Sequence, residues 1–371
     1  MERCLAHIEK IDWIRPIEGA DKIELCGVLG WQCVIAKKDN FKVGDTIVYI
    51  EVDSVVPEVS QFEFLRDRKF RVRTIKLKGE LSQGLVIPVP KDLTKRTIGL
   101  DVTDALGITK YMSPSEKEEA DREERSRLYE RNKLKKFMLR YSWYRRIFLS
   151  RKQKEGFPYW VSKTDEERIQ NMPHVLEQFA DELVYVTEKI DGQSATFTGK
   201  MVPQFGGYVG RLLPKKFKFV VCSRNLTTND KNTLYWKIAE RYNIENILKE
   251  NPTLTIQGEQ NDTKVQGNKY GFKEPVFHVF NIIDHENNYQ YNIYEMKAFC
   301  DVYGLKTVPI IATGIPLRSV GESVPLVIEA SKSTSAIAPI YREGIVVRCV
   351  KNGKKILSFK CINPDFLLKY E

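Results

Sequence analysis

The sequence predicts an α+β protein in which a small β-barrel precedes a larger domain of antiparallel strands. In the first part, short apolar runs are broken by glycines such as Gly30, Gly44 and Gly79, which is typical of a barrel or sandwich. The second half mixes strand-like runs with helical patterns and shows no regular alternation of strand and helix. We expect a barrel over 1–107, a charged helical linker over 108–160 and a second domain over 161–371.

The barrel strands are expected at 5–14, 22–29, 31–36, 46–52, 70–77 and 85–89. The segment from Pro16 to Leu25 resembles the opening of tRNA-binding OB modules, in which an Ala-Asp-Lys-Leu-like stretch leads into the second strand. This resemblance implies an OB-fold barrel.

Basic residues alternate with apolar residues along the fifth of these runs, at Arg71, Arg73, Lys76 and Lys78. One strand face is therefore expected to present four cations to a phosphate backbone. Exposed edge strands carry similar charges for solubility, and the sequence leaves both interpretations open.

The linker changes character along its length. After Ser113 and Pro114, acidic residues precede basic ones, which favours a helix. Basic residues from Lys133 to Lys154 then alternate with aromatic residues. Two interpretations remain: an interdomain helix whose aromatics pack while its bases stay in water, and a surface that follows RNA.

Composition narrows the class of partner. The formal net charge of +10 and the pI near 9.0 predict a polyanionic partner, either nucleic acid or a membrane surface. No apolar run of about 18 residues and no secretory signal is present, so we expect a cytoplasmic or nuclear protein. We further expect a monomer without a membrane partner. The seven scattered cysteines include no Cys-x-x-Cys pair, which favours buried thiols over a zinc site.

The second domain carries the candidate catalytic and binding residues. Helices are expected at 165–170 and 232–250, and strands at 183–187, 217–222, 254–258, 276–283 and 344–349. Glu188-Lys189-Ile190-Asp191-Gly192 follows the first of these strands. A Lys-x-Asp-Gly match alone is weak, since a chain of this length contains one by chance roughly once in ten.

Five further segments follow in a fixed order. They are Cys-Ser-Arg-Asn at 222–225, Ile-Gln-Gly-Glu at 256–259, Phe-His-Val-Phe-Asn at 277–281, Glu-Gly-Ile-Val-Val-Arg at 343–348 and Ser-Phe-Lys at 358–360. Together with residues 188–192, and in this order, the five segments resemble the nucleotidyltransferase motifs I, Ia, III, IIIa, IV and V of covalent ligases and capping enzymes. Together with the N-terminal OB-like part and the segments 71–79 and 163–170, the whole chain resembles the fifth family of RNA ligases.

The resemblance implies an antiparallel nucleotidyltransferase domain of the ATP-grasp-like ligase type. It also implies ATP and Mg²⁺ or Mn²⁺ as cofactors, and RNA or an RNA-containing nicked duplex as the partner. DNA ligases and capping enzymes usually continue into an OB domain after motif V, whereas this sequence ends eleven residues after Lys360. RNA ligase is therefore favoured over another covalent nucleotidyltransferase and over an RNA-binding protein with an inactive ligase domain.

The resemblance also assigns roles to residues. Lys189 is the expected nucleophile, with Lys360 and Glu343 as further catalytic residues. The expected ATP- or AMP-binding residues are Glu188, Ile190, Arg224, Glu259, Phe280 and Lys360. The expected metal-binding residues, acting largely through water, are Asp191, Glu259 and Glu343.

Lysine chemistry adds an electrostatic expectation. An amine attacks phosphorus only when neutral, and an ordinary lysine pKa near 10.4 leaves about one molecule in 2,500 neutral at pH 7. Burial, a bound metal and the cation of Lys360 are expected to lower the pKa of Lys189. Motif V departs from many RNA ligases because Ile362 stands where a second lysine is usual. Lys351, Lys354 or Lys355 are the candidates to compensate.

Three glycines flank the expected functional residues. Gly192 is expected to let the turn after the nucleophile pass close to the nucleotide. Gly258 and Gly344 are expected to act similarly beside the acidic residues.

Overall fold

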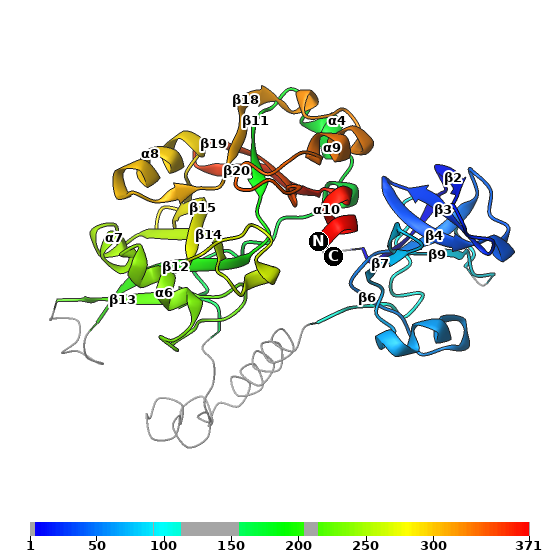
Figure 1. The fold of residues 1–371 in the computed structure, drawn as a ribbon, viewed down its shortest axis with the longest axis horizontal. Coiled ribbons are helices and arrows are strands. Elements are labelled where there is room, and N and C mark those ends of the chain that lie inside the picture. Colours follow the sequence, from blue (N-terminus) through cyan, green and yellow to red (C-terminus); the bar gives the residue numbers. More distant parts are fainter. Residues whose placement is uncertain (1–3, 92, 113–155, 204–213, 371) are drawn as a thin grey trace, which may run out of the picture.

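The computed structural model describes residues 4–91, 93–112, 156–203 and 214–370. Two β-rich parts are joined into one molecule, the first made from the N-terminal third of the chain (Figure 1). The helix and the basic–aromatic stretch expected within 113–155 lie outside the described residues. Among those described, none of the helices combines the length and apolar character needed to cross a lipid bilayer.

The N-terminal part consists of short antiparallel strands. They are β1 (Ala6–Lys10), β2 (Trp13–Pro16), β3 (Ile23–Val28), β4 (Trp31–Ala36), β5 (Thr46–Ile50), β6 (Ser54–Val55), β7 (Thr74–Leu77), β8 (Glu80–Gln83), β9 (Leu85–Pro88) and β10 (Thr109–Lys110). Their orders are β1-β5-β9, β2-β3-β4, β7-β8 and β10-β6. In β4, Trp31, Cys33 and Ile35 point inward while the residues between them are partly exposed, which is the period-two pattern that predicts such strands.

The basic strand differs from its prediction. It begins only at Thr74, because Lys69 and Phe70 adopt left-handed backbone conformations with φ of 53° and 55°. Arg71 is bonded to Asp53, and its guanidinium lies 3.4 Å from the ring centroid of Tyr111.

The other basic residues of that run also differ from the prediction. Lys76 donates a hydrogen bond of 2.7 Å to the carbonyl of Leu368, and Lys78 lies in the turn before β8 with φ of 51°. Arg73 precedes the strand. Positions 71 and 73 have opposite parity to 76 and 78, so a period-two strand places the two pairs on opposite faces. A single face with four cations does not form.

The C-terminal domain contains two antiparallel sheets. The first has the order β18-β11-β19-β20, built from β11 (Leu183–Lys189), β18 (Ile310–Pro316), β19 (Gly344–Lys351) and β20 (Lys354–Ile362). The second has the order β13-β12-β14-β15-β16, built from β12 (Gln193–Val202), β13 (Lys216–Cys222), β14 (Leu254–Asn261), β15 (Val276–Asp284) and β16 (Tyr289–Gln290). A short strand, β17 (Lys306–Thr307), pairs in parallel with β15. The expected α+β class with antiparallel sheets is confirmed.

Helices cover one face of the second sheet (Figure 1). These are α6 (Leu234–Arg241), α7 (Ile244–Glu250) and α8 (Ile293–Tyr303). The single helix expected at 232–250 is divided because Asn243 has φ of 52°. The first sheet packs with α4 (Val175–Gln178) and α9 (Val324–Ser331) around a second core.

The helix expected at 165–170 is wrong. Residues 162–167 form no helix or strand, and only Ile169–Asn171 forms a 3₁₀ turn. The backbone N–H of Lys360 donates to the carbonyl of Glu167 at 2.8 Å, so this segment lies along β20. Tertiary contacts therefore override a local sequence with good helix propensity.

The two parts of the molecule are in contact. The C-terminal helix α10 (Pro364–Tyr370) packs on β8 through a cluster of Leu81, Ile362 and Leu367. The guanidinium of Arg168 also lies 5.2 Å from the ring centroid of Trp31 in the N-terminal part.

Candidate active site

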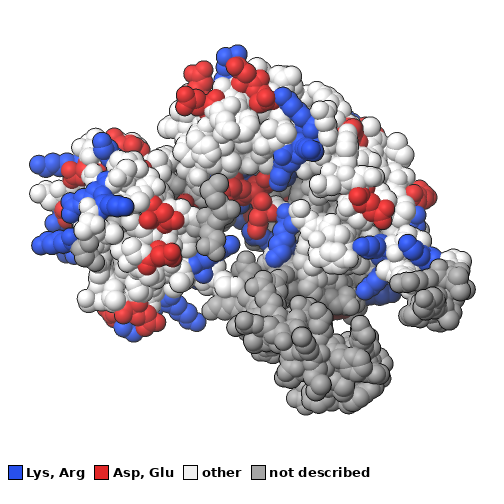
Figure 2. All heavy atoms as spheres, turned by 180° about the vertical axis from the view of Figure 1, so that it is seen from behind, with Lys and Arg blue, Asp and Glu red and all other residues white. Residues whose placement is uncertain are grey.

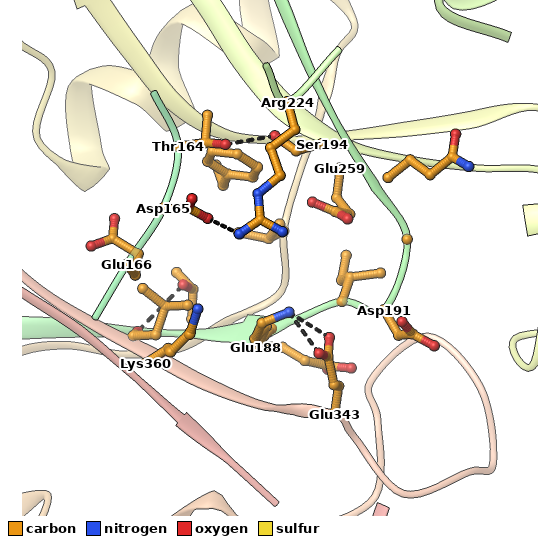
Figure 3. Close-up of a pocket in the computed structure, with 18 of the residues that line it drawn as sticks. Thr164, Asp165, Glu166, Glu188, Asp191, Ser194, Arg224, Glu259, Glu343 and Lys360 are labelled. Carbon is orange, nitrogen blue, oxygen red and sulfur yellow. Dashed lines mark hydrogen bonds and ion pairs between the residues drawn. The ribbon is translucent and has the colours of Figure 1, made fainter. Parts of the chain in front are cut away.

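A pocket of about 510 Å³ lies where the two sheets of the C-terminal domain meet. Lys189 ends β11 in the first sheet, and Gln193 begins β12 in the second. The expected nucleotide, metal and catalytic residues all line this one pocket (Figure 3). They are Glu188, Lys189, Ile190, Asp191, Arg224, Glu259, Phe280, Glu343 and Lys360. The fold thus brings together segments that are 171 positions apart, from 189 to 360.

Lys189 and Glu343 form the central ion pair. The Nζ of Lys189 donates to both carboxylate oxygens of Glu343 at 2.7 Å. Lys189 pairs across the ladder with Gly344, so Glu343, the residue preceding β19, is placed directly against Lys189. The two side chains are 26% and 12% exposed, which leaves a route for a ligand from solvent.

The charge state of Lys189 differs from expectation. Burial lowers its pKa, but Glu343, Glu259 and Asp191 act in the opposite direction and leave the pKa raised. The expected lowering is therefore absent in the protein alone, because three carboxylates outweigh burial and the cation of Lys360.

Glu259 is the most strongly perturbed acid in the pocket. It lies in β14 opposite Ser194 of β12. Burial, together with Glu343 and Asp191, raises its pKa to about 8, although Lys189 lowers it. A buried carboxylate that shares a pocket with two others is suited to a hard cation, because such an ion removes their mutual repulsion.

The third acid is engaged elsewhere. Asp191 forms an ion pair of 2.6 Å with Lys269, and its backbone N–H donates to the hydroxyl of Tyr270 at 3.0 Å. Among the residues that the structure describes, no three His, Cys, Asp or Glu side chains are grouped for direct metal ligation. The donor set therefore fits a metal that keeps most of its waters, as Mg²⁺ does.

Lys360 supplies a second cation. It lies in β20 opposite Val346, and burial followed by the nearby charges of Lys189 and Arg168 lowers its pKa to about 8. Within the described parts of the chain, no carboxylate lies within ion-pair distance of its ammonium. It is therefore available to an anionic ligand.

The candidates to compensate for Ile362 lie outside the pocket wall. Lys351 pairs with Glu182, and Lys355 lies 3.9 Å from Glu166. Lys354 is exposed in the same hairpin.

Phe280 and Arg348 form the opposite wall. The Nη1 of Arg348 donates to the carbonyl of Phe280 at 2.6 Å, and the guanidinium lies 5.6 Å from the Phe280 ring centroid. Glu166 accepts from Arg348 at 2.8 Å. Burial raises the pKa of Glu166, but the charges of Arg348 and Lys355 lower it by more. The pKa of this buried acid therefore lies below the usual range for glutamate.

Several pocket residues were missed by sequence reasoning. Asp165 pairs with Arg224, and Thr164 hydrogen-bonds Ser194 at 2.8 Å (Figure 3). Gln266 also lines the pocket. The local sequence around Asp165 favours a helix, and its partners are distant in sequence, so the local pattern does not place this segment in the pocket.

Two expected nucleotide contacts have side chains that are already engaged. The Glu188 carboxylate is buried and accepts from the hydroxyl of Ser335 and from the backbone N–H of Ala336. Ile190 is 3% exposed and packs in a small apolar cluster. Their roles toward a nucleotide remain proposals.

The three glycines are needed for a different reason from the expected one. A Cβ at Gly344 would lie 2.1 Å from the carbonyl oxygen of Cys361, and one at Gly258 would lie 2.5 Å from that of His278. A Cβ at Gly192 would lie 2.6 Å from the Asn261 side chain. Protein atoms, rather than a nucleotide, occupy the space that these side chains would need.

Comparison with known proteins decides the family. A family model described as RNA ligase matches residues 182–369, and one described as an OB-fold domain matches residues 5–89. This chain belongs to the RNA ligase family. The OB-fold and RNA ligase expectations are confirmed, and among curated proteins none matches the sequence.

Solved RNA ligase structures match the chain along its whole length. A Naegleria gruberi RNA ligase with PPi is 29% identical with a TM-score of 0.69, over 100% of this chain and 99% of that one. A variant of that ligase with AMP and Mn is 29% identical with a TM-score of 0.70, over 99% of both chains. Another variant with ATP and Mn is 29% identical with a TM-score of 0.69, over 98% of both.

Proposed function

We propose that this RNA ligase uses ATP and a divalent cation, Mg²⁺ or Mn²⁺, to join RNA 3'-hydroxyl and 5'-phosphate ends through AMP on Lys189. The observation that carries the proposal is the meeting of Lys189, Glu343, Glu259 and Lys360 in one pocket. The similar ligase solved with ATP, AMP, PPi and Mn supports the same ligands for this chain.

Each wall of the pocket suits one part of ATP. Phe280 offers an aromatic face for adenine, and the Arg348 guanidinium with its bond to the Phe280 carbonyl holds that strand in place. Arg224 can exchange Asp165 for the ribose or phosphates, since both side chains are more than half exposed. Lys360 can hold the α-phosphate as charge builds on its oxygens.

The carboxylates control the reactivity of Lys189. As long as Glu343 accepts from its Nζ, the amine stays protonated and cannot attack. A divalent cation at Glu259 and Glu343 would neutralise these acids and supply positive charge beside the phosphoryl oxygens. Lys189 then loses its proton more readily, because Lys360 and burial both disfavour its charge.

Three covalent steps follow, each an exchange of one bond to phosphorus for another. The neutral Nζ of Lys189 attacks the α-phosphorus of ATP, an N–P bond forms and pyrophosphate leaves. An oxygen of the RNA 5'-phosphate attacks the same phosphorus and releases the lysine. The 3'-hydroxyl then attacks the activated 5'-phosphate, loses its proton and releases AMP, which leaves a phosphodiester.

The test uses α-labelled ATP with Mg²⁺ or Mn²⁺ and denaturing electrophoresis. Wild-type protein should retain label, and Lys189→Ala should retain none. That variant should still seal a strand that carries a 5'-adenylate, because the lysine acts only in the first two steps. Loss of this activity in a folded variant would contradict the assigned role of Lys189.

Two other functions are outcomes of the same experiment. Label from α-labelled GTP but not from ATP would indicate a capping-type enzyme. An absence of label from either nucleotide would indicate an RNA-binding protein with an inactive ligase domain.

We propose nicks with RNA on the 3'-hydroxyl side as the substrate, on the basis of the family resemblance. Nicked duplexes with RNA or DNA on each side of the break test this directly. Equal sealing of all-DNA and RNA-containing nicks would overturn it.

We also propose the boundaries 1–107, 108–160 and 161–371 for the parts of the chain. Limited proteolysis should cut first within 108–160. We further propose a monomer that acts in the cytoplasm or nucleus, which light scattering and microscopy of tagged protein can check.

A further inference from the structure

A group of aromatic and basic side chains lies at the end of β12 that is distant from the pocket. Tyr159 is 86% exposed, and its ring meets that of Trp160 edge to face with 5.1 Å between centroids. The Nζ of Lys200 lies 5.3 Å and 5.2 Å from these two ring centroids and donates to the Tyr159 hydroxyl at 3.3 Å. Trp160 is fixed by its Nε1–H, which donates to Thr198 at 3.2 Å. The two rings therefore hold the Lys200 ammonium in place.

Two further lysines lie on the same face. Lys200 is directly opposite Lys218 of β13, and Lys216 lies two positions from Lys218. Paired residues of an antiparallel ladder share a face, as do residues two apart in a strand. Both β13 lysines are exposed. Figure 2 shows Lys and Arg side chains on the side of the C-terminal domain that lies away from the N-terminal part. We call Tyr159, Trp160, Lys200, Lys216 and Lys218 the β12 platform.

The segment that carries Tyr159 and Trp160 leads from the β12 platform to the pocket. Residues 159–164 run along β12 toward the active site, where the hydroxyl of Thr164 bonds that of Ser194 at 2.8 Å. Thr164 and Ser194 both line the pocket. Lys200 is six positions from Ser194, so at about 3.3 Å per residue the β12 platform lies roughly 20 Å from the site of chemistry.

We propose that the β12 platform binds the sugar-phosphate backbone of the nucleic-acid substrate at a distance from the break. This inference rests on the proposed ligase function. Lys200, Lys216 and Lys218 place three positive charges on one face of the sheet, and such a face attracts the phosphates of a nucleic-acid backbone. The Tyr159 hydroxyl accepts from Lys200, so its own hydrogen is available to donate to a phosphate oxygen. At about 3.4 Å per base pair, 20 Å corresponds to roughly six base pairs of flanking duplex.

The first test is the salt dependence of binding. The triple variant Lys200→Ala, Lys216→Ala, Lys218→Ala is compared with wild type on a nicked duplex that has a blocked 3' end and no ATP. Each phosphate contact contributes about 0.9 to the slope of log K against log salt, so three contacts predict a slope smaller by about 2 to 3. The triple Lys→Arg variant should keep the wild-type slope. Tyr159→Ala should weaken binding and change the slope by less than the triple Lys→Ala variant does.

A matched control removes the same residue types from the opposite side of the sheet. It carries Lys237→Ala in α6, Lys249→Ala in α7 and Tyr294→Ala in α8, and all three side chains are exposed. This control is matched to the variant Tyr159→Ala, Lys200→Ala, Lys218→Ala, which also loses two lysines and one tyrosine. It should bind and seal like wild type.

The second test varies the length of the flanking duplex. Nicks are placed in hairpin substrates with one flank of about four or about twelve base pairs, on the 3'-hydroxyl side and then on the 5'-phosphate side. The triple Lys→Ala variant should lose sealing of long-flank substrates on one side at moderate salt and seal short-flank ones like wild type.

The outcomes separate this proposal from the proposed function. Labelling of Lys189 by ATP without RNA should be the same in the triple Lys→Ala variant as in wild type. If wild type itself gains no label, the proposed ligase function is contradicted, not the role of the β12 platform. An unchanged salt slope would overturn the β12 platform as a backbone site. So would an equal loss on short and long flanks, because that result indicates a defect at the pocket.

Discussion

Gly344→Ala tests whether the residue after Glu343 serves the protein backbone or the nucleotide. Gly344 pairs with Ile362 where β19 and β20 meet beside the pocket. Its conformation is not left-handed, so alanine introduces no φ strain. The whole effect of the substitution must therefore come from the added Cβ.

The structure gives the size of the effect. The added carbon would lie 2.1 Å from the carbonyl oxygen of Cys361 and 3.0 Å from the Cα of Ile362. Ordinary contacts need more than about 3 Å, so the strands must separate by roughly 1 Å. Overpacking costs about 1–3 kcal/mol, and a disturbed ladder hydrogen bond adds about 1 kcal/mol. We expect Gly344→Ala to lower the free energy of unfolding by roughly 2–4 kcal/mol without any ligand.

Urea denaturation of the ligand-free protein measures this, and labelling of Lys189 with ATP measures the functional consequence. Lys354→Ala, an exposed change in the same hairpin, is the control and should leave both unchanged. If Gly344→Ala unfolds like wild type and loses only ATP labelling, the glycine serves nucleotide approach and the backbone argument is wrong.

Three other predictions follow from burial and contacts. His7 is buried between two glutamates whose hydrogen bonds outweigh burial and raise its pKa to about 9. It therefore adds roughly 3 kcal/mol of stability below pH 6.5 that is lost as pH rises to 9, and His7→Gln should flatten urea midpoints across that range. Phe280→Ala should raise the KM for ATP in Lys189 labelling by roughly one to two orders of magnitude, from about 1–3 kcal/mol of stacking, while Phe280→Tyr stays near wild type. Leu367→Ala, which opens the buried cluster with Leu81, should lower the free energy of unfolding by about 2–4 kcal/mol in urea; a change under 0.5 kcal/mol would show that this contact is unimportant.

The barrel was predictable where one strand face is buried. In β4 the alternation of inward Trp31, Cys33 and Ile35 with exposed neighbours is visible in the sequence. The pattern does not predict β8, because this strand follows the turn at Lys78 and Gly79, where both residues have positive φ, and the burial of its Leu81 depends on contact with α10. Local patterns report burial by neighbouring strands but not by a helix some 280 positions away.

The failed helix at 165–170 shows the same limit for polar residues. Its acids favour a helix locally, yet Asp165 pairs with Arg224, 59 positions away, and Glu166 with Arg348, 182 positions away. The order of the motifs predicts that Lys189, the acids and Lys360 share one site, and all of them line the pocket. Segment 163–170 also contributes to the family resemblance, but its residue pattern does not show that it lies in the pocket.

The pKa of Lys189 could not be inferred from residue types, because its direction depends on which charges lie closest. Lys360 and burial were expected to dominate, but Glu343 accepts two hydrogen bonds from the amine and Glu259 adds a second acid. A lysine that is protonated in the free protein does not react with stray electrophiles. The acids that keep Lys189 protonated are also the residues whose charges suit a divalent cation. We infer that the arrangement makes the nucleophile reactive only when a cation and a nucleotide occupy the pocket together, since only then are the acids neutralised beside an α-phosphate.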